Sequence, residues 1–210
     1  MKVFIQFVTF FILGSMQTLS IAETSTTEKI TEPLSTTQTP INWASPKSIK
    51  EHMVYKLEPV KGESTFAPNV ALSDPTLTEN FSEIYLVRSE NFEDGESFTL
   101  FVTASYTDNE WRNYNKATTA KDDVLDISTL KKTKMGCDNK GSCNYEEQLA
   151  ITLGFLEIVD SMSTHLELIL GNNSLSSSSL NNTSNSNQRV DHIKIPGSYF
   201  LAIMRTLRAE

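Results

Sequence analysis

The residues of this chain that could do chemistry are few and scattered. There are only three histidines, His52, His165 and His192, and none lies in a dense metal-ligand motif. If the strands that carry the last two pair with each other, their imidazoles could approach and, with Glu167 or Asp191, hold a metal ion. We favour the alternative that both histidines face water on polar strand faces. The sequence therefore predicts no metal ligand, no catalytic residue and no cofactor.

The sequence contains none of the short motifs that are typical of common active sites. We find no G-x-S-x-G nucleophile, no H-E-x-x-H, no dinucleotide fingerprint and no paired C-x-x-C. Gly136 and Gly141 have the spacing of a phosphate loop, but Ser142 stands where the lysine belongs and no strand-then-helix context surrounds it. The acidic runs 93–96 and 122–126 lack the ligand spacing of a calcium loop. These absences lower the expectation of an enzyme without removing it.

Trp111, Arg112, Tyr114 and Glu147 are the remaining candidates, as partner-binding residues. Aromatic side chains beside an arginine can form a ligand surface, or they can be a core tryptophan with a neighbouring surface pair, which we favour. Glu147 is a carboxylate on an otherwise apolar strand face. It is either an edge residue that reaches water or the partner of a cation such as Arg112. A buried and paired Glu147 would be the first place to look for function.

The two cysteines, Cys137 and Cys143, flank a good turn, Asp138–Gly141, in which Asp and Asn bond locally and Gly supplies positive φ. They are too few for a structural zinc site, and their spacing is not that of a C-x-x-C redox motif. We expect a disulfide because the chain carries an export signal, described below. Closing a seven-residue loop stabilises a fold by about 2.4 kcal/mol in the chain-entropy model.

Residues 143–153 are the most clearly predicted strand of the chain. Apolar side chains recur at every second position, interrupted on that face by Glu147. Short helices are predicted at 47–53, after Ser45 and Pro46, and at 155–162, and the three-to-four spacing at 199–208 predicts an amphipathic C-terminal helix. Residues 59–79 are predicted to be loop-rich. Residues 54–57 are expected to be an extended segment, and further strands are predicted at 84–88, 97–107, 110–117, 124–134, 166–170 and 189–195.

About seven short strands separated by turns predict a mainly β fold. We expect an antiparallel β-sandwich or half-barrel with a short N-terminal helix and the amphipathic C-terminal helix. Residues 45–210 are expected to be a single β-rich domain containing a disordered Asn/Ser-rich loop at 171–188. Residues 23–44, rich in Thr, Ser and Pro, are expected to be a disordered linker because they have little apolar surface to bury.

The N-terminus has the design of a signal peptide over residues 1–22. Lys2 precedes an apolar run at 3–14, and Ser20-Ile21-Ala22 places small residues for cleavage after Ala22. The run is too short for a stable membrane span. Cleavage would remove one of 18 basic residues and none of 26 acidic ones, leaving a net charge near −9. Such a charge repels phosphate backbones, so nucleic acid is not expected as a partner.

Three segments resemble small exported proteins and lipoproteins of Gram-negative bacteria, which are mostly uncharacterised. These are Trp111–Ala117, Gly141–Glu147 with the strand that follows, and Ile195-Pro196-x-x-Tyr199, and the resemblance spans about 84–208. The chain departs from them by lacking a lipidation cysteine and by its Asn/Ser-rich loop. The resemblance implies a bacterial envelope location, periplasmic or secreted, and carries over no catalytic residues.

Together these observations predict an exported β-rich envelope protein, a non-enzymatic binding or structural module with an unknown protein or envelope partner. The alternative is a periplasmic, hydrolase-like enzyme whose site assembles from dispersed Asp, Glu, Ser and His residues.

Overall fold

The computed structural model describes residues 40–58, 62–91, 95–172 and 190–205, which belong to one compact unit. The predicted signal peptide, most of the predicted linker and nearly all of the Asn/Ser-rich loop lie outside the described residues. Ile41 and Trp43, at the end of the predicted linker, pack against the hydrophobic core.

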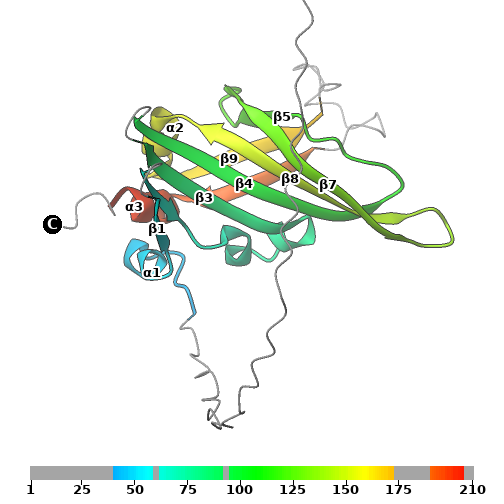
Figure 1. Ribbon diagram of the computed structural model, residues 1–210, viewed down its shortest axis with the longest axis horizontal. Coiled ribbons are helices and arrows are strands. Elements are labelled where there is room, and N and C mark those ends of the chain that lie inside the picture. The colour runs from blue at the N-terminus through cyan, green and yellow to red at the C-terminus, as the bar shows by residue number, and fades with distance from the viewer. Residues whose placement is uncertain (1–39, 59–61, 92–94, 173–189, 206–210) are drawn as a thin grey trace, which may run out of the picture. The chain divides into compact units, whose positions relative to one another are not determined.

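A six-stranded antiparallel sheet runs through the unit in the order β1-β2-β3-β4-β8-β7 (Figure 1). Two of its strands, β4 and β8, alternate between buried residues, most of them apolar, and more exposed ones, as the period of a half-buried strand requires. The strands are β1 (Val54–Glu58), β2 (Gly62–Phe66), β3 (Phe81–Asn91), β4 (Gly95–Asp108), β7 (Ile127–Cys137) and β8 (Cys143–Leu153).

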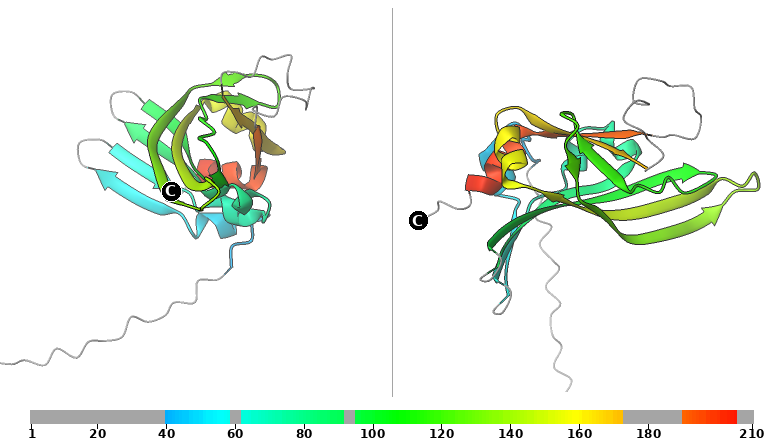
Figure 2. Two further views of the ribbon diagram at one scale, coloured as in Figure 1. Left: turned by 90° about the vertical axis from the view of Figure 1, so that its right-hand side faces the viewer. Right: turned by 90° about the horizontal axis from the view of Figure 1, so that it is seen from above.

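A four-stranded antiparallel sheet, in the order β10-β9-β5-β6, supplies the other side of the core (Figure 2). Only Asp126 separates β6 from β7, so the chain passes directly from the smaller sheet to the edge of the larger one. Thr152 N donates to Asp126 O at 2.9 Å, which fastens this crossing to β8. The strands are β5 (Lys116–Thr119), β6 (Val124–Leu125), β9 (His165–Gly171) and β10 (Asp191–Pro196).

Three short α-helices lie at the opposite end of the sheets from the β7–β8 turn (Figure 1). They are α1 (Pro46–Lys50), α2 (Phe155–Ser161) and α3 (Gly197–Met204), and two 3-10 turns occupy Val70–Ser73 and Leu77–Glu79. Ser45 caps α1 by accepting from Ser48 N, as predicted. The predicted C-terminal helix begins two residues early, at Gly197, and most of its residues are buried, so it is a core helix rather than a surface one. Residues 206–208 lie outside the described part.

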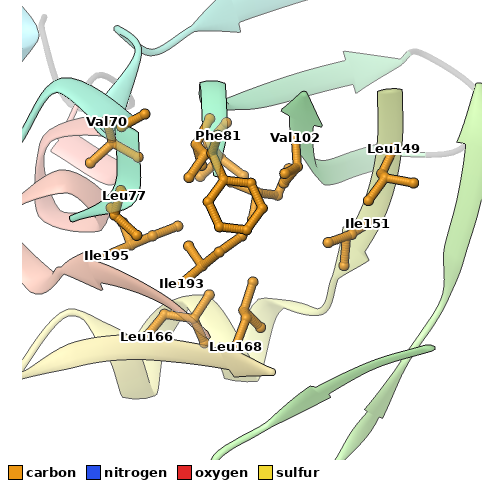
Figure 3. Close-up of a cluster of buried hydrophobic side chains, with 14 of the residues drawn as sticks. Val70, Leu77, Phe81, Val102, Leu149, Ile151, Leu166, Leu168, Ile193 and Ile195 are labelled. Atoms are coloured by element: carbon orange, nitrogen blue, oxygen red, sulfur yellow. The ribbon is translucent and has the colours of Figure 1, made fainter. Parts of the chain in front are cut away.

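The hydrophobic core lies between the two sheets. Figure 3 shows Phe81, Val102 and Ile151 of the larger sheet facing Leu168 and Ile193 of the smaller one. All five side chains are at most 2 % exposed. Burial of these apolar surfaces is the main favourable term that holds the sheets together.

The prediction of a mainly β, antiparallel fold with few helices is confirmed. The strand predicted at 110–117 is wrong, because only its last two residues belong to β5 and residues 109–115 are irregular. The loop-rich segment predicted at 59–79 contains β2, which pairs with both β1 and β3. With β6 and β7 separate, the described residues form ten strands rather than seven.

Candidate functional site

The irregular segment 109–115 crosses from β4 to β5, and side chains of the sheets hold its backbone. Arg112 N donates to the Tyr106 hydroxyl at 2.9 Å, and Asn113 N donates to Glu147 Oε1 at 3.0 Å. Asn113 has a φ of 55°, in the left-handed region, which a strand cannot accommodate. This is why the apparent alternation at 110–117 does not form a strand.

Arg112 lies inside the protein, with its side chain 4 % exposed. Its Nη1 donates to the Tyr114 hydroxyl at 2.9 Å and to Asp191 Oδ2 at 3.2 Å. It donates as well to Asn80 Oδ1 at 3.1 Å. The guanidinium carbon is 4.1 Å from the centre of the Tyr106 ring, a cation–π contact. The Tyr114 hydroxyl donates to Asp191 Oδ2, so one carboxylate oxygen holds both groups.

Glu147, on the apolar face of β8, is fully buried. The Tyr106 hydroxyl and Asn113 N both donate to its Oε1. Lys132 Nζ on the neighbouring β7 is 3.1 Å from Oε2, an ion pair that lacks the directionality of a hydrogen bond. The cation that pairs with Glu147 is therefore Lys132 and not Arg112, which pairs with Asp191.

We call Tyr106, Arg112, Tyr114, Glu147 and Asp191 the buried polar cluster. Burial raises the pKa of the Tyr106 phenol well above its usual range, and its hydrogen bond to Glu147 adds to the effect. Burial also raises the pKa of Tyr114, helped by the negative charge of Asp191. Both phenols stay protonated and remain hydrogen-bond donors, as the two carboxylates require.

The structure brings all four candidate binding residues together, three of them inside the protein. Trp111 is the exception: it is half-buried, with its ring centre 4.6 Å from that of Tyr145. Lys132 Nζ is 5.5 Å from the centre of the Trp111 ring. Most of the hydrogen bonds of the cluster run between its own members or to the backbone of 109–115, while Arg112 Nε and Glu147 Oε2 make none among the described residues. The arrangement therefore positions segment 109–115 rather than presenting an open site.

A separate pocket of about 430 Å³ lies between the β5–β6 turn, α2 and the start of β9. We call it the acidic pocket. Asp122, with a φ of 66°, makes the tight turn, and Ala120 N donates to Glu167 O at 3.1 Å to join the turn to β9. Its charged or titratable lining residues are Lys121, Asp123, Glu157, Asp160, His165 and Glu167.

Charged groups in and beside the acidic pocket are partly paired. Lys121 Nζ is 2.9 Å from Asp160 Oδ2. Glu167 lies between two imidazoles, with His165 Nε2 at 4.0 Å and His192 Nδ1 at 3.5 Å. The strands that carry the histidines do pair, and both histidines are exposed, as predicted. Among the described residues no group of three or more His, Cys, Asp or Glu side chains could hold a metal ion.

Sequence reasoning missed the acidic pocket, because its lining comes from three segments that share no motif. The predicted disulfide is confirmed: Cys137 and Cys143 are bonded, with an S–S distance of 2.09 Å. It closes the turn between β7 and β8, at the strand pair that carries Lys132 and Glu147.

None of the helices in the described ranges is long and apolar enough to cross a membrane. Comparison of the chain with protein-family models, curated proteins and solved structures finds no match.

Proposed function

We propose that the protein is an exported, non-enzymatic binding module and that the acidic pocket is its binding site. The observation that carries this proposal is the pocket itself. Its volume of about 430 Å³ lies within the range of small-ligand sites, about 300 to 1,000 Å³. Leu166 gives it an apolar wall, and polar groups converge on it from the β5–β6 turn, α2 and β9.

The hydrogen bonds of the buried polar cluster indicate a structural role, so we place ligand binding outside the cluster. Its guanidinium bonds to Asp191, while Glu147 and the Tyr106 hydroxyl accept from the backbone of 109–115. A group held in this way stabilises the scaffold on which a site is built. Trp111 is the member of the predicted binding set that a partner could reach directly.

We further propose a half-barrel architecture, with a β-sandwich as the alternative. The passage of residues 124–137 from the smaller sheet to the edge of the larger one supports a half-barrel on that side.

Export, by a signal peptide at 1–22, remains part of the proposal. The disulfide supports it, because disulfides persist in oxidising compartments such as the periplasm. The resemblance to small exported proteins of Gram-negative bacteria suggests the periplasm or the medium, with a protein or envelope partner.

A hydrolase-like enzyme is the second candidate, favoured by the placement of His165 near Glu167 in the acidic pocket. A carboxylate beside an imidazole can orient it as a general base. Hydrolysis of chromogenic esters by the wild type, lost in His165→Ala, would support the enzyme over the binding module.

Ligand-observed NMR with a fragment library tests the binding proposal. Ala120 lines the pocket, so Ala120→Trp should fill it and abolish the signals of bound fragments. Ala150→Trp, on the outward face of β8, is the matched control and should keep them. Fragments that bind the Ala120→Trp variant as well as the wild type would contradict the proposal.

A further inference from the structure

We propose that the acidic pocket takes an organic cation, a primary amine or guanidinium that carries a short apolar chain. This inference rests on the proposed function, because it names the ligand class of the same site. It is carried by the net charge of the lining, by an ammonium–carboxylate contact already present there, and by the apolar surface beside it.

The charge of the pocket is strongly one-sided. Four carboxylates line it, against one lysine. A neutral ligand would not neutralise these carboxylates, and the carboxylates would repel an anion. A concave wall concentrates such a field, so a cation is the ligand whose approach the pocket favours.

The chain itself places one ammonium on this lining. Lys121 Nζ contacts Asp160 Oδ2 at 2.9 Å, with both side chains more than half exposed. Asp160 raises the pKa of Lys121, through a hydrogen bond first and its charge second. The contact shows that a carboxylate of this pocket accepts an ammonium donor, and that Lys121 competes for that carboxylate with any ligand.

Glu167 is the second carboxylate positioned for a cationic donor. It projects from β9 between His165 and His192, with side-chain nitrogens at 4.0 and 3.5 Å. Neither distance is a close hydrogen bond, so its oxygens retain acceptor capacity. Asp123, by contrast, already accepts from the Thr119 hydroxyl at 3.1 Å.

Apolar surface lies next to these carboxylates. Leu166 is buried in the wall, and Leu156 on α2 lines the pocket while 73 % exposed. Phe155, its neighbour, is 54 % exposed. Leu156 is therefore apolar surface on the lining that a ligand with a hydrocarbon chain would cover on binding.

Three probes of equal chain length isolate the head group: n-hexylamine, n-hexanol and n-hexanoate, titrated into the mature protein by isothermal calorimetry. We expect hexylamine to bind about tenfold more tightly than hexanol, since a charge-assisted hydrogen bond is the stronger kind. Hexanoate should not bind. The affinity for hexylamine should fall as salt is added, because exposed charges are screened.

Two substitutions should move the hexylamine affinity in opposite directions. Glu167→Gln should weaken binding by about tenfold, because it removes a charged acceptor. Lys121→Ala should strengthen binding by about threefold, because it frees Asp160 from a surface ion pair. Lys131→Ala, an exposed lysine of β7, is the control and should change nothing. A gain of affinity in Lys121→Ala cannot arise from damage to the fold.

The outcomes separate this inference from the proposed function. If hexanol binds as tightly as hexylamine, or if Lys121→Ala weakens the amine, the cation inference is wrong and the pocket remains a binding site. If no probe binds at millimolar concentration, the cation inference also fails. If, in addition, no library fragment distinguishes wild type from Ala120→Trp, the proposed function fails with it.

Discussion

Glu147 is the residue for which the sequence-based interpretation and the structure agree most closely. A carboxylate on an apolar strand face is costly to bury without partners. Here two donors and a lysine surround it: the Tyr106 hydroxyl, Asn113 N and Lys132 Nζ. The interpretation of Glu147 as buried and paired is therefore the one that the structure supports, and the pairing partner comes from the adjacent strand.

A double-mutant cycle should show that Glu147 and Lys132 are coupled. Glu147→Leu leaves the Tyr106 hydroxyl and Asn113 N without an acceptor and should cost about 3 kcal/mol of unfolding free energy. Lys132→Met leaves a buried carboxylate unpaired and should cost about 2 kcal/mol, discounted for the partial exposure of the lysine. The double variant should lose clearly less than the sum, measured by urea denaturation. Lys131→Met, on the outward face, is the control and should show no coupling to Glu147. Strictly additive losses of unfolding free energy in the Glu147 and Lys132 variants would contradict the coupling.

Three tyrosines should make the protein less stable at alkaline pH. Burial raises the pKa of Tyr106, Tyr114 and Tyr199 above the ordinary value. The unfolded chain loses these protons near pH 10 while the folded chain keeps them, so stability is full below about pH 10 and falls as pH rises further.

The ultraviolet absorbance of phenolate checks this prediction. At about pH 11 the folded protein should show at least three fewer phenolates than the same protein in denaturant, out of six tyrosines. Ionisation of all six tyrosines while circular dichroism stays native would rule the prediction out.

At the scale of elements, the first residue of α3 lies very close to the backbone that follows α2. Gly197 N donates to Thr164 O at 3.0 Å, which brings α3 against the end of α2. A Cβ on Gly197 would lie 2.7 Å from Met162 O and Ser161 O and 2.8 Å from Thr164 O. These are backbone atoms of a packed turn and cannot rotate away.

Gly197→Ala should therefore destabilise the protein by about 3 kcal/mol, a fall of roughly 10 °C in Tm. Gly154→Ala, just before α2, is the matched control. Its Cβ would meet only the carboxylate end of Glu157, which can turn aside. We expect that variant to lie within about 1 kcal/mol of wild type. Equal losses in both variants by thermal denaturation would count against this account.

The disulfide links the two ends of the turn in the β7–β8 hairpin. Replacing both Cys137 and Cys143 by serine should lower the free energy of unfolding by about 2 kcal/mol, because the unfolded chain regains the freedom of a short loop. Reductant should lower the stability of the wild type by a similar amount and leave the double variant unchanged. Two alkylatable thiols in the native secreted protein would refute the disulfide.

For the whole molecule, export is the property that a single experiment can decide. Expressed in a Gram-negative host with its own leader, the protein should be recovered outside the cytosol with Glu23 as its first residue. Ala22→Tyr should block this cleavage, because the position requires a small side chain. Recovery of the wild type with Met1 intact, by N-terminal sequencing, would overturn the proposed signal peptide.

Local patterns predicted the elements whose partners are near in sequence or whose burial is regular. The alternation in β4 and β8, the Ser45 cap of α1 and the turn between the cysteines are of this kind. The strand predicted at 110–117 failed because its backbone donors bond to side chains of β4 and β8, which no local pattern contains. β2 was missed because neighbouring strands, rather than its own composition, hold it in the sheet.

The sequence by itself determined the β-rich class of the fold, the disulfide and the anomaly of Glu147, because alternation, cysteine spacing and a misplaced charge are local signals. Only the tertiary structure decided which cation neutralises Glu147, which carboxylate pairs with Arg112 and where a pocket opens. Those outcomes depend on strand order and on contacts between residues far apart in the chain. The pairing of β7 with β8 brings Lys132 to Glu147, and the joining of the β5–β6 turn to β9 builds the acidic pocket.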